Sequence, residues 1–332
     1  MSNNTSQSCT IAPPNIPSDA GIAGAGILIA FITTATLALL LSSYLTLSTL
    51  RPSASSRIIS LTTTIARQLL GGLSDQQLIS GISIQSLALA RLHTITPYHF
   101  FIIWMLSLLS TATNFAALLA LVQDFKRDWV LRWLRQAAMF VNMGLGVVLG
   151  VLVLEVQLKK LPETMAVGCV WDEGFKQADL EKEGGNNVLS VVGTIAVIAA
   201  SAIIFALGTW YLHLRVQIWG RFVRVVSLVI LWAVAVAATV RVVTVSQAFG
   251  TPSVELADEG ERQWSFGQLL SLVLLVLPLI SALEIYRGQL KVAACEGEKG
   301  EVVESDQVPL TAGGNGKASV NRFTYQPNPW FK

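Results

Sequence analysis

Residues 97–127 read PYHFFIIWMLSLLSTATNFAALLALVQDFKR, and this stretch decides the class of the fold. Residues 97–122 contain no Asp, Glu, Lys or Arg. A helix needs about 20 apolar residues to cross the hydrocarbon core of a bilayer. The Lys126-Arg127 pair that follows is typical of a cytosolic flank. The stretch therefore predicts a transmembrane helix that ends on the cytosolic side.

Six other stretches predict further spans, which makes an all-α, polytopic membrane bundle of seven transmembrane helices over residues 21–286. The chain is 52% hydrophobic and only 13% charged, whereas soluble domains carry roughly 25% charged residues. The second span is the most polar, so we expect it to face the bundle interior. The predicted spans are Gly21–Leu47, Asp75–Ile95, Pro97–Val122, Gln136–Val156, Asn187–Leu214, Phe222–Ser246 and Trp264–Tyr286.

Positive charge gathers in every second break between the spans. Cytosolic loops are enriched in Lys and Arg, so the pattern predicts the N-terminus outside and the C-terminus in the cytosol. Four lysines in the break between the fourth and fifth spans weaken the asymmetry without reversing it. The basic breaks hold Arg51, Arg57 and Arg67 after the first span, Lys126, Arg127, Arg132 and Arg135 after the third, and Arg215, Arg221 and Arg224 after the fifth.

The polar N-terminal segment, residues 1–20, fits an extracellular side. Asn3 and Asn4 each begin an N-glycosylation sequon, which requires the lumenal or outer face. Cys9 and Cys169 both fall outside in this topology, and two interpretations stay open: a disulfide in an oxidising compartment, or two unpaired thiols. Cys295 falls inside.

Two segments near the predicted cytosolic face lie outside the spans. Residues 57–70 are amphipathic, which favours a helix on the inner leaflet over a solvated linker. Residues 287–332 are rich in Gly, Glu, Lys, Ser and Asn, which predicts a disordered cytosolic tail. The tail is a candidate contact for a cytosolic partner. No retention signal occurs in the sequence, so the plasma membrane is the default location, with another endomembrane as the alternative.

Four cationic or ionisable residues are predicted at one depth near the outer side: Arg91, His93, His99 and Arg241. Such groups are costly inside a membrane and need a reason to be there. One interpretation is an outer pocket for an anionic or polar ligand. The other is snorkelling, or structural pairing with a carboxylate such as Glu155 or Glu255.

For other polar and small residues in the spans, a structural role is the first interpretation. Glu284 near the inner end of the last span predicts either a proton relay or an interfacial ion pair. Asn114 and Asn142 are expected to form hydrogen bonds between helices. Pro278 is expected to kink the last span. The glycines that open the first span, Gly21, Gly24 and Gly26, permit close helix approach.

Several functional classes lack their signatures. The three histidines are scattered and no phosphate-binding loop occurs, so we predict no metal and no cofactor. The last span has no lysine for a retinal Schiff base, and the D-R-Y and N-P-x-x-Y signatures of G-protein-coupled receptors are missing. The sequence has no basic patch interleaved with aromatics, which a nucleic-acid surface would need, so we predict no nucleic-acid partner.

Four strings resemble a large group of functionally uncharacterised multi-span membrane proteins of filamentous ascomycete fungi. The resemblance implies the membrane fold and brings no known reaction. Ser74-Asp75 within the first string is expected to cap the second span, and Gln268 in the last is expected to face the bundle. Asn114 stands where the group is expected to carry a histidine, so no polar site is carried over there. The strings are GLSDQQLISG (72–81), IAGAGILIAF (22–31), PYHF (97–100) and WSFGQLL (264–270).

The function that fits these features best is a non-enzymatic sensor or membrane scaffold. Its outer loops and outer cavity would meet a small lipophilic or anionic ligand or a partner. The alternative is a membrane-embedded enzyme or transporter for a small lipophilic substrate, within fungal secondary metabolism. In that case Arg91, Arg241 and Glu284 are the first candidates for its site.

Overall fold

The computed structural model describes residue 9 and residues 12–50, 61–122, 129–172, 188–213 and 220–287. Within these ranges the chain is helical, with one isolated bridge between Ile16 and Leu256 and no named strand. Two short 3-10 helices are η1 (Val167–Trp171) and η3 (Gly260–Arg262). The long helices are α1 (Ala25–Leu50), α2 (Leu61–Ala90), α3 (Pro97–Ala120), α5 (Trp129–Leu158), α6 (Val188–His213), α7 (Gly220–Val245) and α8 (Phe266–Leu274), which is followed by a further helical stretch over 276–287.

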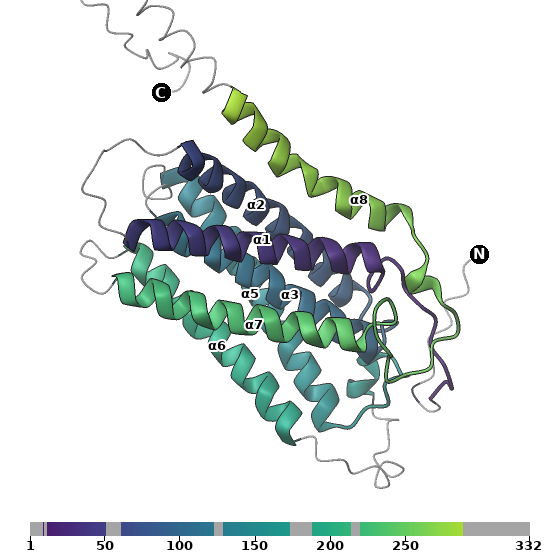
Figure 1. Cartoon of the computed structure of the whole chain (residues 1–332). Helices are drawn as coiled ribbons and strands as arrows, with labels where there is room; N and C mark the ends of the chain where they lie inside the picture. Colours follow the sequence, from purple (N-terminus) through teal and green to yellow (C-terminus); the bar gives the residue numbers. More distant parts are fainter. Residues whose placement is uncertain are drawn as a thin grey trace, which may run out of the picture. The chain divides into compact units, whose positions relative to one another are not determined.

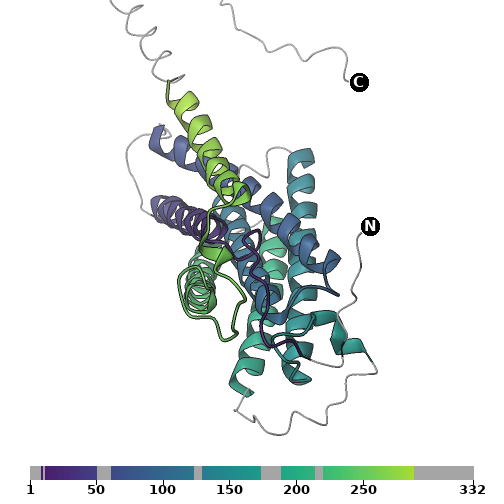
Figure 2. The same cartoon turned by 90° about the vertical axis from the view of Figure 1, so that its right-hand side faces the viewer.

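The helices alternate in direction along the chain (Figures 1 and 2). Asp19 before α1 pairs with Arg91 before α3, and Ser42 far along α1 donates to the Ala116 carbonyl far along α3. Helices α1 and α3 are therefore parallel. The final turns of α5 and α7 line one cavity, so these two helices also end together. The intervening helices α2 and α6 run back along the bundle.

Five helical stretches are long and apolar enough to cross a membrane. They match the first, third, fourth, sixth and seventh predicted spans, so the prediction of an all-helical membrane protein is confirmed. The second and fifth predicted spans are helical as well, but α2 falls short by composition and α6 contributes only a shorter apolar stretch, Val191–Ile203. The five stretches are Ala25–Thr49, Pro97–Ala120, Trp133–Leu158, Phe222–Val245 and Gly260–Arg287.

The predicted limits of the second span were wrong at both ends. Helix α2 begins at Leu61, so the described part of the amphipathic segment 57–70 forms its first turns. It ends at Ala90, which leaves Arg91 and His93 in the turn before α3. The predicted Ser74 cap is also wrong, because Ser74 lies in mid-helix and donates to Asn114 instead, at 2.9 Å.

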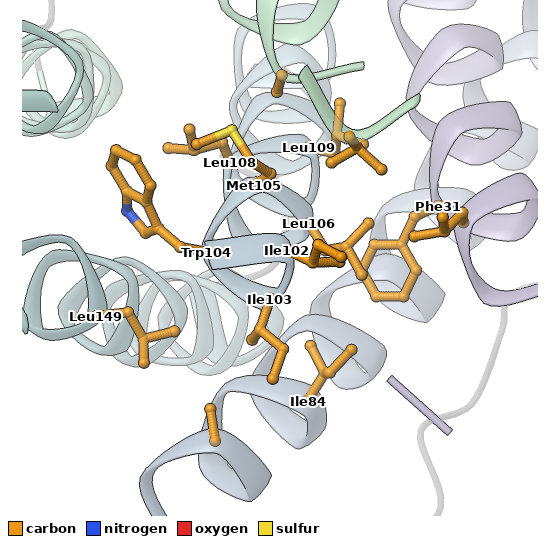
Figure 3. Close-up of a cluster of buried hydrophobic side chains, with 14 of the residues drawn as sticks. Phe31, Ile84, Ile102, Ile103, Trp104, Met105, Leu106, Leu108, Leu109 and Leu149 are labelled. Carbon is orange, nitrogen blue, oxygen red and sulfur yellow. The ribbon is translucent and has the colours of Figure 1, made fainter. Parts of the chain in front are cut away.

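Helix α3 forms the centre of the core. Its side chains are buried from Pro97 to Leu119 with one partly exposed exception, Phe101. Figure 3 shows Trp104 on one side of α3 and Phe31 of α1 on the other, with Leu149 of α5 and Ile84 of α2 completing the cluster. Apolar side chains of α1, α2 and α5 therefore pack around α3 from several sides.

Compared with a soluble protein, more polar side chains are buried and more large apolar side chains are exposed. Among the described residues, polar side chains such as Gln77, Gln85 and Asn142 are buried between α2, α3 and α5. Large apolar side chains such as Ile79 and Phe266 are exposed, at 69% and 80%. An exposed apolar surface of this extent marks contact with lipid or protein. Helix α2 can carry polar residues in such a bundle because Gln77 and Gln85 face inward.

Helix α8 is held by polar contacts rather than by a broad apolar face. The fully buried Gln268 accepts a hydrogen bond from the Gly26 N–H at 3.1 Å and donates to the Gln263 carbonyl at 2.9 Å. A side chain on Gly24 would collide with the Gln268 amide. The predicted close approach at this glycine pair, with Gln268 facing the bundle, is confirmed.

At Pro278, where a kink was predicted, the helix is interrupted and its free backbone groups bond to a neighbouring helix. The helical pattern is interrupted at Leu275, just before Pro278, whose ring nitrogen cannot bond the Leu274 carbonyl. The Gln76 side-chain amide, oriented with its nitrogen toward this carbonyl, donates to Leu274 and accepts from the Leu275 N–H, both at 3.2 Å. A neighbouring side chain thus compensates the proline break, as membrane helices require.

Candidate functional site

Four segments come together at one end of the bundle, which we call the capped end: residues 12–24, 91–96, 159–172 and 246–265. Main-chain hydrogen bonds connect them. The Ile16 N–H donates to the Glu255 carbonyl at 3.2 Å, and the Ile16 carbonyl accepts from the Ala257 N–H at 2.8 Å. The Gly168 N–H donates to the Leu92 carbonyl at 2.8 Å. The loops therefore form one structured cover.

A disulfide bond joins Cys9 to Cys169 within this cover, with Cα atoms 5.5 Å apart. The sequence left this pairing and two free thiols open, and the structure contains the bond. It closes a separation of 160 residues, so it ties the N-terminal segment to the loop that contains η1. Asn3, Asn4 and Cys295 lie outside the described residues.

Asp258, at the surface of the cover, forms a second attachment for the N-terminal segment, at Ser18. The Ser18 hydroxyl and the Ser18 N–H donate to this carboxylate. Because these bonds favour the charged form, they hold the pKa of Asp258 below its usual range. The contact is solvent-exposed.

A carboxylate lies completely buried under the cover. Glu261 of η3 has an exposure of 0% and accepts two hydrogen bonds from the first turn of α3. The Tyr98 hydroxyl donates to one oxygen at 2.8 Å, and Nε2 of His99 lies 3.0 Å from the other. The Thr96 hydroxyl lies 3.0 Å from Nδ1 of His99, which fixes the ring from its second nitrogen. A buried ionisable group with specific partners is a mark of a functional site.

The Tyr98 side of this cluster opens on a cleft of about 360 Å³ between the ends of α3, α5 and α7. Small-molecule sites are typically about 300–1,000 Å³. Its polar lining includes Arg241 and Lys160, together with Glu163, whose carboxylate accepts from the Ser253 hydroxyl. Its apolar lining includes Phe100, Phe101, Val153, Val156, Leu161 and Val245. We call this the cationic cleft.

The His99 side of the cluster opens on a second, smaller cavity of about 140 Å³. Arg91 and Asp19 line it and form an ion pair at 3.2 Å. Tyr98 and His99 thus separate two cavities, and both residues bond to the same Glu261.

The structure brings together some of the predicted site residues. Arg91 and His99 line the small cavity, whereas Arg241 lines the cationic cleft. His93 reaches neither, because its ring fills the space above Gly168 of η1. Glu284 is exposed near the opposite end of the bundle and is absent from both cavities. Three of the four residues predicted to share one pocket therefore line two separate cavities, and the fourth lines neither.

The carboxylate partners differ from those the sequence suggested. Arg91 pairs with Asp19 and His99 with Glu261, whereas Glu155 and Glu255 form no ion pair in the described part of the chain. Neither Glu261 nor Lys160 is among the site residues that the sequence predicts. No local signal distinguishes Glu261 from Glu259, since the burial of Glu261 depends on α3.

No protein-family model, curated protein or solved structure matches this chain.

Proposed function

We propose that all seven long helices cross the bilayer, with the capped end outside. Two features support this. The parallel pairs α1/α3 and α5/α7 require α2 and α6 to return along the bundle, and Ser74, Gln77 and Gln85 of α2 are buried in it. The basic breaks would then lie in the cytosol. Plasma membrane, N-glycosylation at Asn3 or Asn4, a cytosolic partner of the tail and membership of the fungal group stay predictions.

We further propose a non-enzymatic sensor that binds a small lipophilic anion in the cationic cleft. The observation that carries this proposal is that Arg241 and Lys160 line the same cleft as a set of apolar side chains. In the described chain Arg241 makes no ion pair with protein. A carboxylate or phosphate head would meet both cations while its hydrocarbon part covers Phe100 and Phe101.

A path for the response begins at Tyr98, which lines the cleft. Its hydroxyl bonds to Glu261, and Glu261 lies five residues before the start of α8 at Phe266. A ligand that displaces Tyr98 would change the position of Glu261 and therefore the docking of α8. Few apolar contacts hold this helix in place. A shift of α8 between two positions would then be the two-state change that a sensor needs.

Binding of oleate tests the ligand assignment. We expect the purified full chain in nanodiscs to bind a fluorescent oleate saturably, and Arg241→Leu to weaken binding about tenfold, which corresponds to ~1.4 kcal/mol. Arg91→Leu is the matched control, because Arg91 lies at the same end and pairs with Asp19 at the small cavity, outside the cationic cleft. Its affinity should equal that of the wild type.

The uncharged alcohol of the same chain length completes the test. It should bind weakly and equally to the wild type and to Arg241→Leu. If Arg241→Leu binds oleate as tightly as the wild type while its melting temperature is unchanged, the cleft is not the anion site.

A membrane enzyme or transporter for a small lipophilic substrate is the second candidate, and one observation favours it. Tyr98 lines the cleft, and its hydroxyl donates to the buried Glu261, so this pair would place a proton donor and acceptor close to a bound substrate. If Tyr98→Phe keeps oleate affinity but abolishes a metabolite in cell extracts, the enzyme replaces the sensor.

A further inference from the structure

A second polar site lies deep between α2, α3 and α5, away from both cavities. The side-chain nitrogen of Gln85 donates to the Gly81 carbonyl and to Oδ1 of Asn142, both at 2.9 Å. Oδ1 of Asn142 also accepts from the Ser110 hydroxyl at 3.3 Å, and its nitrogen donates to the Thr111 hydroxyl at 3.3 Å. The predicted interhelical role of Asn142 is confirmed.

One acceptor in this cluster has no partner. Gln85 has an exposure of 0%, and its buried Oε1 receives no hydrogen bond. Buried polar atoms in proteins are nearly always bonded to protein or to ordered water. The rule is stricter inside a membrane, where no bulk solvent can reach the atom.

Gly146 of α5 leaves a space beside this oxygen. A Cβ placed on Gly146 would lie 3.4 Å from Oε1 of Gln85 and 3.4 Å from Oγ of Ser107. The same glycine lines a cavity of about 10 Å³ with the polar side chains of Ser107, Thr111 and Ser201. This volume is close to the ~10–15 Å³ that one water molecule requires.

We propose that a single structural water molecule occupies the space at Gly146 and donates one hydrogen to Gln85 Oε1 and the other to Ser107 Oγ. Ser107 uses its own hydrogen on the Trp104 carbonyl, at 2.8 Å, so its oxygen is available to accept. The water completes the polar cluster that joins three helices. The site depends on neither the ligand nor the topology proposed above.

Two alanine variants on the same helix separate the water from simple packing. Gly146→Ala places a methyl group at ordinary contact distance, so in a dry bundle it should stabilise the helix as much as Gly144→Ala, whose Cβ would meet nothing within 4 Å. With water present, Gly146→Ala expels it and leaves the acceptor unpaired. We expect its melting temperature to lie about 2–6 °C below that of Gly144→Ala.

Gly146→Ser is the rescue variant, because its hydroxyl can replace the water as donor to Gln85. We expect it to recover most of the loss seen in Gly146→Ala. An alanine variant as stable as Gly144→Ala would overturn the proposal. So would stabilisation of the wild type by Na⁺ and not by K⁺, which would assign the oxygens to a cation.

Radiolytic labelling of the wild type provides a readout that does not depend on the folding of any variant. Bound water generates hydroxyl radicals locally, so Trp104, which lines the cavity and is only 2% exposed, should be oxidised. Absence of label on Trp104, with normal labelling of the exposed Trp171, would overturn the proposal.

Discussion

A Glu261→Ala variant should lose about 2–6 kcal/mol of the free energy of unfolding, because it leaves two buried polar groups unpaired at about 1–3 kcal/mol each. The side chain has no solvent exposure, so water cannot replace it. The substitution leaves His99 and the Tyr98 hydroxyl without their common acceptor. Thermal unfolding of the purified chain in detergent measures the loss, at roughly 2–4 °C per kcal/mol for large domains.

Glu259→Ala is the matched control for this experiment. Glu259 lies two residues earlier, its side chain is 73% exposed, and it pairs with Arg262 at 3.5 Å. Exposed pairs contribute about 0–1 kcal/mol, so the control should melt close to the wild type. Equal melting temperatures for the two variants would show that the carboxylate of Glu261 is solvated in the native protein, contrary to this structure.

A Gly26→Val variant should displace the start of α8 and cost about 3 kcal/mol, the sum of overpacking and a lost hydrogen bond. A Cβ on Gly26 would lie 2.7 Å from Cβ of Gln268 and 2.9 Å from its carbonyl oxygen, so backbone must move. The movement breaks the bond from the Gly26 N–H to Gln268, which satisfies an otherwise unpaired donor in the first turn of α1.

Gly267→Val is the control, because Gly267 also lies in a first helical turn but a Cβ placed on it would meet nothing within 4 Å. Thermal unfolding compares the two variants, and limited proteolysis of the 246–265 loop reports whether α8 has separated from α1. A Gly26→Val protein that melts with Gly267→Val and resists protease equally would contradict the docking described here.

The sequence predicts the class of this fold well, because each long apolar run has one stable solution in a membrane. Residues 97–122 are helical almost to the predicted end, and the glycines at 24 and 26 receive Gln268 as their spacing suggested. The limits of α2 could not be found in the same way. Its hydrophobicity is interrupted by glutamines, and only the contacts of Gln77 and Gln85 with α3 and α5 reveal that these belong to the interior.

The candidate site is less accessible to sequence reasoning. Arg91, His99 and Arg241 stand out as costly groups in apolar stretches, and each does line a cavity. Their separation into two cavities depends on how α3 packs between α1 and α7. Glu261 is separated from His99 by 162 residues, and Lys160 lies in a break between spans. Neither position carries a pattern that links it to the cluster.

The most direct test of the central claim, a seven-span bundle with the capped end outside, is the location of the break at residues 123–128. An epitope tag inserted there should be inaccessible in intact cells and labelled once digitonin opens the plasma membrane, while an N-terminal tag lies on the other side of the membrane. If the two tags label on the same side, α2 does not cross, and the seven-span arrangement with its outer cleft is contradicted.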